Sequence, residues 1–324
     1  MIYLEYLLAA SIVVILSIKA SKYVDLLDKN TMLSGAFLGG ILLSAVTSLP
    51  EFFTSISATI MLDRPGMCMG NILGSNLFNL AELAFFTLVF FKIFSKGRVS
   101  RSYRHVAVMV LLIYGLIVLN FTGVLHFNIL HISVTSILIV LIYAVGAKYL
   151  AVAEDYETDE DLLDYHAASA TKLSVQQICF RLFLSAIGII FSSIILTYLT
   201  EELAVKLDLG QGIAGAILLG IATSLPELSS TVALLRMKNC NIAVGNIVGS
   251  NMFNFIILSA ADMISAERSV YAVLDHEIRS LMIFGAAATA IIWIMLWRKK
   301  RTTQLVCSLG ILLCYLAFLV LWRV

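Results

Sequence analysis

Two short stretches of the chain place hydroxyl groups, a proline and a carboxylate inside long apolar runs. They are Thr47-Ser48-Leu49-Pro50-Glu51 and Thr223-Ser224-Leu225-Pro226-Glu227. In a helix, the threonine and the glutamate of each stretch, four residues apart, face the same way. Proline frees the carbonyl four residues before it, here that of Val46 and that of Ala222. Each stretch therefore presents hydroxyl, carbonyl and carboxylate oxygens, which suit Na⁺ or Ca²⁺ rather than zinc or copper.

These polar groups stand in a chain that is strongly apolar. Its 324 residues are 60% hydrophobic and 13% charged, with a mean hydropathy of +0.96, whereas soluble domains carry roughly 25% charged residues. We expect a polytopic membrane protein with the lipid bilayer as its surroundings, and we expect no nucleic acid, cofactor or obligatory protein partner. Because an acid inside the membrane is functional by default, both glutamates are candidate site residues.

Ten apolar runs are long enough to cross a bilayer of about 30 Å. They fall at 3–19, 32–61, 68–94, 104–122, 129–152, 177–200, 212–236, 240–265, 278–297 and 303–321.

The two halves of the chain repeat one another. The Thr-Ser-Leu-Pro-Glu stretches are 176 residues apart, and the block 70–79 maps onto 245–254 at an offset of 175. An odd number of spans in each half forces the second half to insert upside down. We therefore predict an all-α integral membrane fold of ten transmembrane helices in two inverted five-helix repeats. The second and seventh helices should be broken at proline, as in secondary transporters.

We predict the following division of the chain. The first repeat occupies 1–152 with its motif at 44–79, an acidic linker occupies 153–174, and the second repeat occupies 175–324 with its motif at 220–254.

The distribution of basic residues predicts the orientation. If the N-terminus is outside, 17 of the 22 Lys and Arg residues fall in inner loops, which the positive-inside rule favours. We expect a multi-pass protein of the cell membrane with both termini extracellular and the acidic linker cytoplasmic. The linker is interpreted as a solvated tether, with a weak regulatory Ca²⁺ site as the alternative.

The second repeated block is Gly70-Asn71-Ile72-Leu73-Gly74-Ser75-Asn76, with its counterpart Gly245-Asn246-Ile247-Val248-Gly249-Ser250-Asn251. With the Thr-Ser-Leu-Pro-Glu stretches, these blocks resemble the paired motifs of the calcium/cation antiporter superfamily. The chain is identified, over essentially its whole length, as similar to its prokaryotic sodium/calcium exchanger family.

This resemblance implies Na⁺/Ca²⁺ exchange by alternating access, with Ca²⁺ exported as Na⁺ enters and no enzymatic activity. It makes Glu51 and Glu227 the central acids shared by Ca²⁺ and Na⁺. It also implies backbone carbonyl ligands at Ser44 and Gly220. Hydroxyl and amide groups complete the implied set: Thr47, Ser48, Ser75, Asn79, Thr223, Ser224, Ser250 and Asn254.

The chain departs from the family pattern at several positions. Val46 and Ala222 stand where glycine is usual, and Asn254 stands where several relatives have Asp, which argues against K⁺ dependence. Glu82 is not expected by the pattern, and its counterpart is the apolar Ile257. It is a candidate for an added ligand or proton carrier, the alternative being a hydroxyl partner on a neighbouring helix.

Two other functions stay open at this point, and a third is not supported. The near alternative is exchange of Ca²⁺, or another divalent cation, against H⁺. A cation channel is the alternative from another class, although two inverted halves favour alternating access. An intramembrane hydrolase lacks a Ser/His or paired Asp constellation, since the five histidines fall at loops or at span ends.

Overall fold

The structure is a computed structural model that describes residues 2–28, 37–97, 99–125, 127–129, 132–151, 173–236, 238–265, 269–298 and 300–321. The described residues are helical apart from short turns and two antiparallel two-residue strands, β1 (Asn128–Ile129) and β2 (Ile132–Ser133). All but the last two positions of the predicted linker lie outside the described residues. At its end, Ser174 caps the next helix by accepting a hydrogen bond from the Gln177 N–H.

The helices divide between the two predicted halves. The first half contains α1 (Ile2–Asp28), η1 (Leu38–Leu43), α3 (Ser44–Thr47), α4 (Leu49–Ile56), η2 (Ser57–Met61), α5 (Pro65–Val89), α6 (Phe91–Lys96), α7 (Ser102–Phe121) and α8 (Val134–Ala151). The second half contains α10 (Val175–Leu207), α11 (Gln211–Ile213), η3 (Ala214–Leu219), α12 (Gly220–Arg236), α13 (Cys240–Ile264), η4 (Val270–Ala272), α14 (His276–Trp297) and α15 (Arg301–Leu321).

The number of candidate membrane spans agrees with the predicted ten. Within the described ranges, nine helices are each long and apolar enough to cross a bilayer, and one bent pair, 39–47 with 49–61, makes the tenth span. The ten-span fold predicted from the sequence is therefore confirmed.

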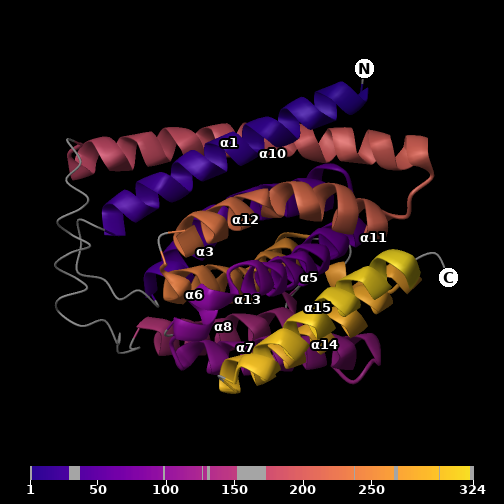
Figure 1. The fold of residues 1–324 in the computed structure, drawn as a ribbon. Helices are drawn as coiled ribbons and strands as arrows, with labels where there is room; N and C mark the ends of the chain where they lie inside the picture. The colour runs from indigo at the N-terminus through magenta and orange to yellow at the C-terminus, as the bar shows by residue number, and fades with distance from the viewer. Residues whose placement is uncertain are drawn as a thin grey trace.

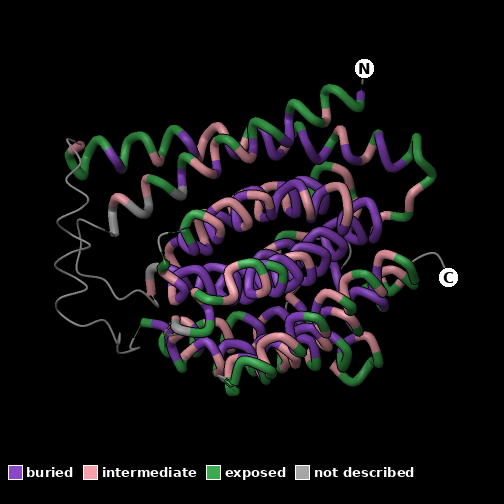
Figure 2. Tube along the Cα trace, viewed as in Figure 1, coloured by how far each residue is buried: buried purple, intermediate pink, exposed green. Residues whose placement is uncertain are grey.

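The helices pack around a buried centre formed by α5 and α13. Helix α1 packs along α10 in the antiparallel direction on one side of the molecule, while α14 and α15 lie on the other side (Figure 1). Buried residues concentrate in α5, α12 and α13, whereas α1 and α10 are exposed along much of their length (Figure 2). The polar motifs therefore lie in the part of the bundle that is farthest from lipid.

The helix interruption takes a different form in each half. In the first, Ser48 leaves the helical conformation at φ −85° and ψ 10°, and α3 and α4 meet there within a span bent by 49°. The Ser48 N–H donates to the carbonyls of Ser44 and Val46, so the Val46 carbonyl is not left unpaired as expected. In the second half, Pro226 lies inside the continuous helix α12, so the break predicted at this proline is not present there. Both motifs directly follow a six-residue π-helical segment, η1 or η3, a feature frequent at functional sites.

The repeated glycines allow α11 and the π-helical segment η1 to approach the central helices. A Cβ at Gly70 would collide with the carbonyl oxygen of Gly212, and one at Gly249 would collide with the carbonyl oxygen of Gly40. Because neither collision involves the end of a flexible side chain, the backbone itself would have to move. These contacts hold each motif against a central helix of the opposite half.

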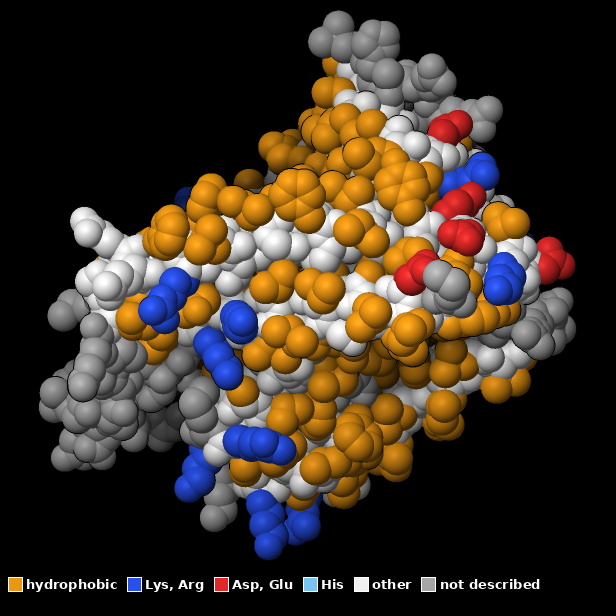
Figure 3. All heavy atoms as spheres, turned by 90° about the horizontal axis from the view of Figure 1, so that it is seen from above, with side chains coloured by type: hydrophobic (Ala, Val, Ile, Leu, Met, Phe, Trp, Pro, Cys, Tyr) orange, Lys and Arg blue, Asp and Glu red, His pale blue; other side chains and the backbone are white. Residues whose placement is uncertain are grey.

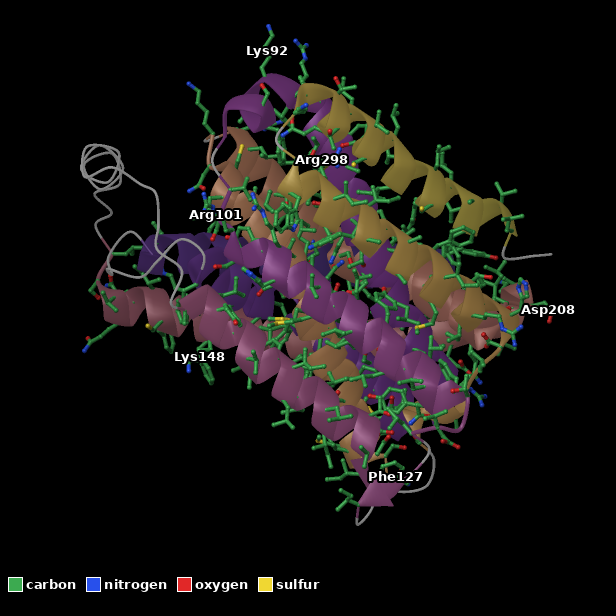
Figure 4. All side chains as sticks on the ribbon, turned by 90° about the horizontal axis from the view of Figure 1, so that it is seen from below. Lys92, Arg101, Phe127, Lys148, Asp208 and Arg298 are labelled. Atoms are coloured by element: carbon green, nitrogen blue, oxygen red, sulfur yellow. The ribbon has the colours of Figure 1, made fainter. Side chains whose placement is uncertain are left out.

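The two ends of the bundle differ in charge. Figure 3 shows apolar side chains over the middle of the α1–α10 face, with most Lys and Arg toward one end and the visible Asp and Glu at the other. From the opposite side, Lys92, Arg101, Lys148 and Arg298 lie at one end, and Asp208 and Phe127 lie at the other (Figure 4). An apolar belt between polar ends is the surface that a bilayer requires.

Candidate cation-binding site

Glu51 and Glu227 are both fully buried and approach each other across the interface between the two halves. Glu51 stands in the first turn of α4, directly after the bend, and Glu227 follows Pro226 in α12. The Ser48 Oγ donates to Glu227 Oε1 at 3.0 Å, and the Ser224 Oγ donates to Glu51 Oε1 at 3.1 Å. Each carboxylate is therefore held by the serine of the other half.

The second oxygen of each carboxylate, Oε2, is also buried, and no described residue donates a hydrogen bond to it. The two carboxylates interact electrostatically, and two like charges repel. A buried ionised carboxylate is costly unless it is paired with a positive charge, bound to a metal or protonated. The arrangement therefore calls for positive charge at the interface between the halves.

Hydroxyl groups of the first motif extend this oxygen cluster toward α13. The Thr47 hydroxyl donates to the Ser44 carbonyl at 3.2 Å and lies 3.3 Å from Asn246 Oδ1 and 3.5 Å from Ser250 Oγ. Ser250 in turn donates to Glu227 Oε1 at 3.4 Å. The Ser44 carbonyl, Thr47 and Ser250 therefore belong to one connected set of oxygens that includes a central acid.

The second motif makes the corresponding contacts with α5, but they are not identical. The Thr223 hydroxyl donates to the Leu219 carbonyl at 2.9 Å and lies 3.4 Å from Asn71 Oδ1. Ser75 donates to the Gly220 carbonyl at 3.2 Å. The carbonyl predicted at Gly220 therefore does face a predicted site serine of the other half.

Four asparagines join α5 to α13 one turn farther along these helices. The Asn79 amide donates to Asn251 Oδ1 at 3.1 Å, and the Asn254 amide donates to Asn76 Oδ1 at 2.9 Å. The Asn251 amide also donates to the Asn76 carbonyl at 2.9 Å. The side-chain oxygens of Asn79 and Asn254 are buried and receive no hydrogen bond from the described residues, which leaves two neutral acceptors at this level.

Four asparagines that contact the predicted site residues were not themselves predicted: Asn71, Asn76, Asn246 and Asn251. Asn71 donates to the hydroxyls of Thr54 and Ser55 at 3.0 and 2.9 Å, which fixes α5 against the bent helix. The sequence could have indicated them, because asparagine occurs at these equivalent positions in both repeated blocks. Spacing on one helix favours Ser75 and Asn79, and it does not predict contacts made to the other half.

Glu82, the acid outside the family pattern, is also buried in α5, and neither of its oxygens accepts a hydrogen bond from a described residue. It interacts electrostatically with Glu227 and lies near the Thr231 hydroxyl. Its counterpart Ile257, on α13, is fully buried in the apolar core. Beyond Glu51 and Glu227, the site therefore has an additional acid on the α5 side and none at the equivalent position of α13.

The chemistry of the donor set is that of hard oxygen ligands. Within the described ranges, no three His, Cys, Asp or Glu side chains gather as a metal-binding group. The predicted cluster instead offers two carboxylates with hydroxyl, amide and carbonyl oxygens. Such a set fits Na⁺ or Ca²⁺ and does not fit zinc or copper.

Comparison with known proteins identifies the family. The sodium/calcium exchanger protein family matches residues 4–151 and 178–323, which is nearly the whole chain. The chain belongs to this family. The family resemblance inferred from the paired motifs is confirmed, and the chain is a membrane transporter rather than an enzyme.

The individual relatives share limited sequence identity with this chain. The sodium/calcium exchanger MaX1 of Methanosarcina acetivorans is 32% identical over 150 residues, which cover 44% of this chain and 39% of that protein. The chain aligns with about two thirds of the length of two further relatives. Among solved structures, the H⁺/Ca²⁺ exchanger CAX matches with a TM-score of 0.73 at 15% identity, covering 99% of this chain and 88% of its own. The sodium-calcium exchanger NCX_Mj matches with a TM-score of 0.65 at 19% identity, covering 99% of each chain.

Proposed function

We propose that this exchanger exports Ca²⁺ against inward Na⁺ by alternating access, with the transported ions bound between Glu51 and Glu227. The observation that carries the proposal is the reciprocal pair of serine–glutamate hydrogen bonds, which leaves one unpaired carboxylate oxygen on each half. Two carboxylates carry the charge that balances one Ca²⁺. Several Na⁺ ions could replace it by using the surrounding hydroxyl, amide and carbonyl oxygens.

The proposed ligand set is the one expected from the motifs. Glu51 and Glu227 would bind Ca²⁺ directly, and the carbonyls of Ser44 and Gly220 would add neutral oxygens. The remaining proposed ligands are Thr47, Ser48, Ser75, Asn79, Thr223, Ser224, Ser250 and Asn254.

The coupling ion separates two candidate functions. MaX1 and NCX_Mj are described as sodium/calcium exchangers, whereas CAX is described as an H⁺/Ca²⁺ exchanger. The Na⁺ proposal rests on the number of neutral oxygens around the central acids. Exchange against H⁺ is the second candidate, and the third buried acid, Glu82, is the observation that favours it.

Transport by the purified protein in liposomes tests the two candidates. Vesicles loaded with Na⁺ and diluted into Na⁺-free buffer should accumulate ⁴⁵Ca²⁺, while vesicles that contain only an outward H⁺ gradient should not. Glu51→Gln protein provides the inactive control. Uptake driven by the H⁺ gradient alone would reject Na⁺ coupling, and Ca²⁺ flux that no counter-ion accelerates would indicate a channel.

We also propose the orientation predicted from the basic residues. The end of the bundle that carries Lys92, Arg101, Lys148 and Arg298 would face the cytoplasm, together with the acidic linker, and both termini would be extracellular. A cysteine introduced at Asp159, in a background without the native cysteines, should resist an impermeant reagent in intact cells. A cysteine at Asp208 should react. The opposite labelling pattern would reverse the orientation.

A further inference from the structure

The sequence repeat makes an asymmetry beside Glu227 easy to recognise. In the first half, the Asn71 amide donates to the hydroxyls of Thr54 and Ser55. The equivalent residues in the second half are Asn246, Ser230 and Thr231. The Asn246 amide and the hydroxyls of Ser230 and Thr231 are all buried, and none has a close hydrogen-bond partner among the described residues. The second half therefore carries the same polar groups without their mutual bonds.

Glu82 lies on this unpaired side. It is 95% buried, since its relative exposure is 5%, and both of its carboxylate oxygens are unpaired within the described structure. The fully buried Thr231 hydroxyl interacts with this carboxylate as a weak hydrogen-bond partner, and Glu227 places a like charge nearby. Helices α5 and α12, which carry these groups, pack side by side (Figure 1). Three carboxylate oxygens, both of Glu82 and Oε2 of Glu227, are thus buried here without a close hydrogen-bond donor among the described residues.

We propose that Glu82 and Thr231 form an accessory site for one monovalent cation beside Glu227, on this side of the centre only. The proposal rests on the proposed cation exchange at Glu51 and Glu227. With Glu82 ionised, three buried carboxylates face this region, and one Ca²⁺ balances two of their charges. The third charge, when Glu82 is not protonated, needs a positive partner, and a single monovalent cation supplies it.

The oxygen composition agrees with this charge count. Carboxylate and hydroxyl oxygens are ligands for hard cations, and a hydroxyl without a close partner is free to turn its lone pairs toward an ion. In the first half the corresponding hydroxyls of Thr54 and Ser55 are already occupied by Asn71, and Ile257 takes the place of the acid. One accessory site per protein, rather than a symmetric pair, follows from these two differences.

Direct Na⁺ binding tests the proposal without requiring transport. The melting temperature of the purified protein in Ca²⁺-free detergent solution is measured as choline chloride is replaced by NaCl at constant ionic strength. A bound ion stabilises the folded state in proportion to the logarithm of its concentration above Kd. The wild type should show the steepest dependence on Na⁺. Glu82→Gln should show a shallower one, while melting higher than the wild type when Na⁺ is absent because an unpaired buried charge has been removed.

Thr231→Val keeps every charge and removes one proposed ligand, so it serves if Glu82→Gln folds poorly. It should raise the Na⁺ concentration needed for half of the stabilisation. The matched control is Thr87→Val in α5, because the Thr87 hydroxyl is bonded to its own helix at the Leu83 carbonyl, 2.8 Å away. An unchanged Na⁺ dependence in both Glu82→Gln and Thr231→Val would overturn the accessory site.

The transport assay separates this proposal from the proposed function. In Glu82→Gln liposomes, Ca²⁺/Ca²⁺ exchange without Na⁺ should persist, while the Hill coefficient for Na⁺ should fall. Loss of Ca²⁺/Ca²⁺ exchange would instead make Glu82 a ligand of Ca²⁺ and would overturn the proposal. If wild-type protein shows no Na⁺-driven uptake, the proposed function fails, and the Na⁺-dependent melting still decides the accessory site.

Discussion

Neutralising either central glutamate should weaken Ca²⁺ binding strongly and by a similar factor. Glu51 and Glu227 are both fully buried, and each contributes one oxygen bonded to a serine and one unpaired oxygen. Replacing one by Gln leaves a single central charge opposite a divalent ion. Removing one partner of a buried ion pair costs about 3–5 kcal/mol, which corresponds to a loss of roughly 10²- to 10⁴-fold in affinity.

Calorimetric titration of Ca²⁺ into detergent-purified protein at pH 8 measures this loss. Glu201→Gln is a suitable control, because Glu201 is an acid of α10 that pairs with Arg64 at 2.7 Å, with side-chain exposures of 20% and 43%. A partly exposed pair of this kind, far from the central acids in sequence, is worth about 1 kcal/mol, so the control should bind Ca²⁺ nearly as the wild type does.

The stability of each variant shows whether a loss of binding reflects misfolding. In the absence of cations, Glu51→Gln and Glu227→Gln should melt at or above the wild-type temperature, because one of two repelling buried charges is gone. A variant that melts normally and still binds Ca²⁺ within tenfold of the wild type would remove that glutamate from the transport site.

Three further predictions concern selectivity, pH and packing. Ser75→Ala and Ser250→Ala should reduce Na⁺-driven exchange more than Ca²⁺/Ca²⁺ exchange, because neutral oxygens matter more for a monovalent ion; the reverse order in liposome flux would contradict this. Lowering the pH from 8 toward about 5 should weaken Ca²⁺ binding, because protons neutralise the acids that bind it. Calorimetry across that range measures the Ca²⁺ affinity, and an affinity that does not change would contradict the prediction. Gly70→Ala and Gly249→Ala should each lower the melting temperature, with an overpacking cost of about 1–3 kcal/mol, whereas Gly115→Ala, which meets no atom within 4 Å, should not.

The fold and the main polar residues could be predicted because the same motifs occur in both halves of the sequence. Apolar length gives the spans, and identical spacing in Thr47–Glu51 and Thr223–Glu227 indicates which residues serve equivalent roles. The same periodicity predicts which side chains share a helix face. It does not predict that Ser48 bonds to the glutamate of the other motif rather than to its own, because that choice depends on how two halves pack.

The differences between the halves could not be predicted for a related reason. Both motifs contain the same proline, yet only the first span is sharply bent, whereas Pro226 is accommodated inside a continuous helix. A proline removes one backbone bond in either case, and the neighbouring helices determine whether the chain bends there. Likewise Asn71 and Asn246 stand at equivalent positions, but only the Asn71 amide N–H donates to hydroxyls of the neighbouring motif.

The exchange of serine–glutamate bonds between the halves has a consequence for transport. Because Ser48 holds Glu227 and Ser224 holds Glu51, neither half can shift relative to the other without disturbing both carboxylates. A cation that binds both acids reinforces this connection, while its departure leaves like charges facing each other. Occupancy of the site and the relative position of the halves must therefore influence each other, since a ligand that binds one arrangement more tightly favours that arrangement. An antiporter needs this coupling, and here it arises from two hydrogen bonds that each join opposite repeats.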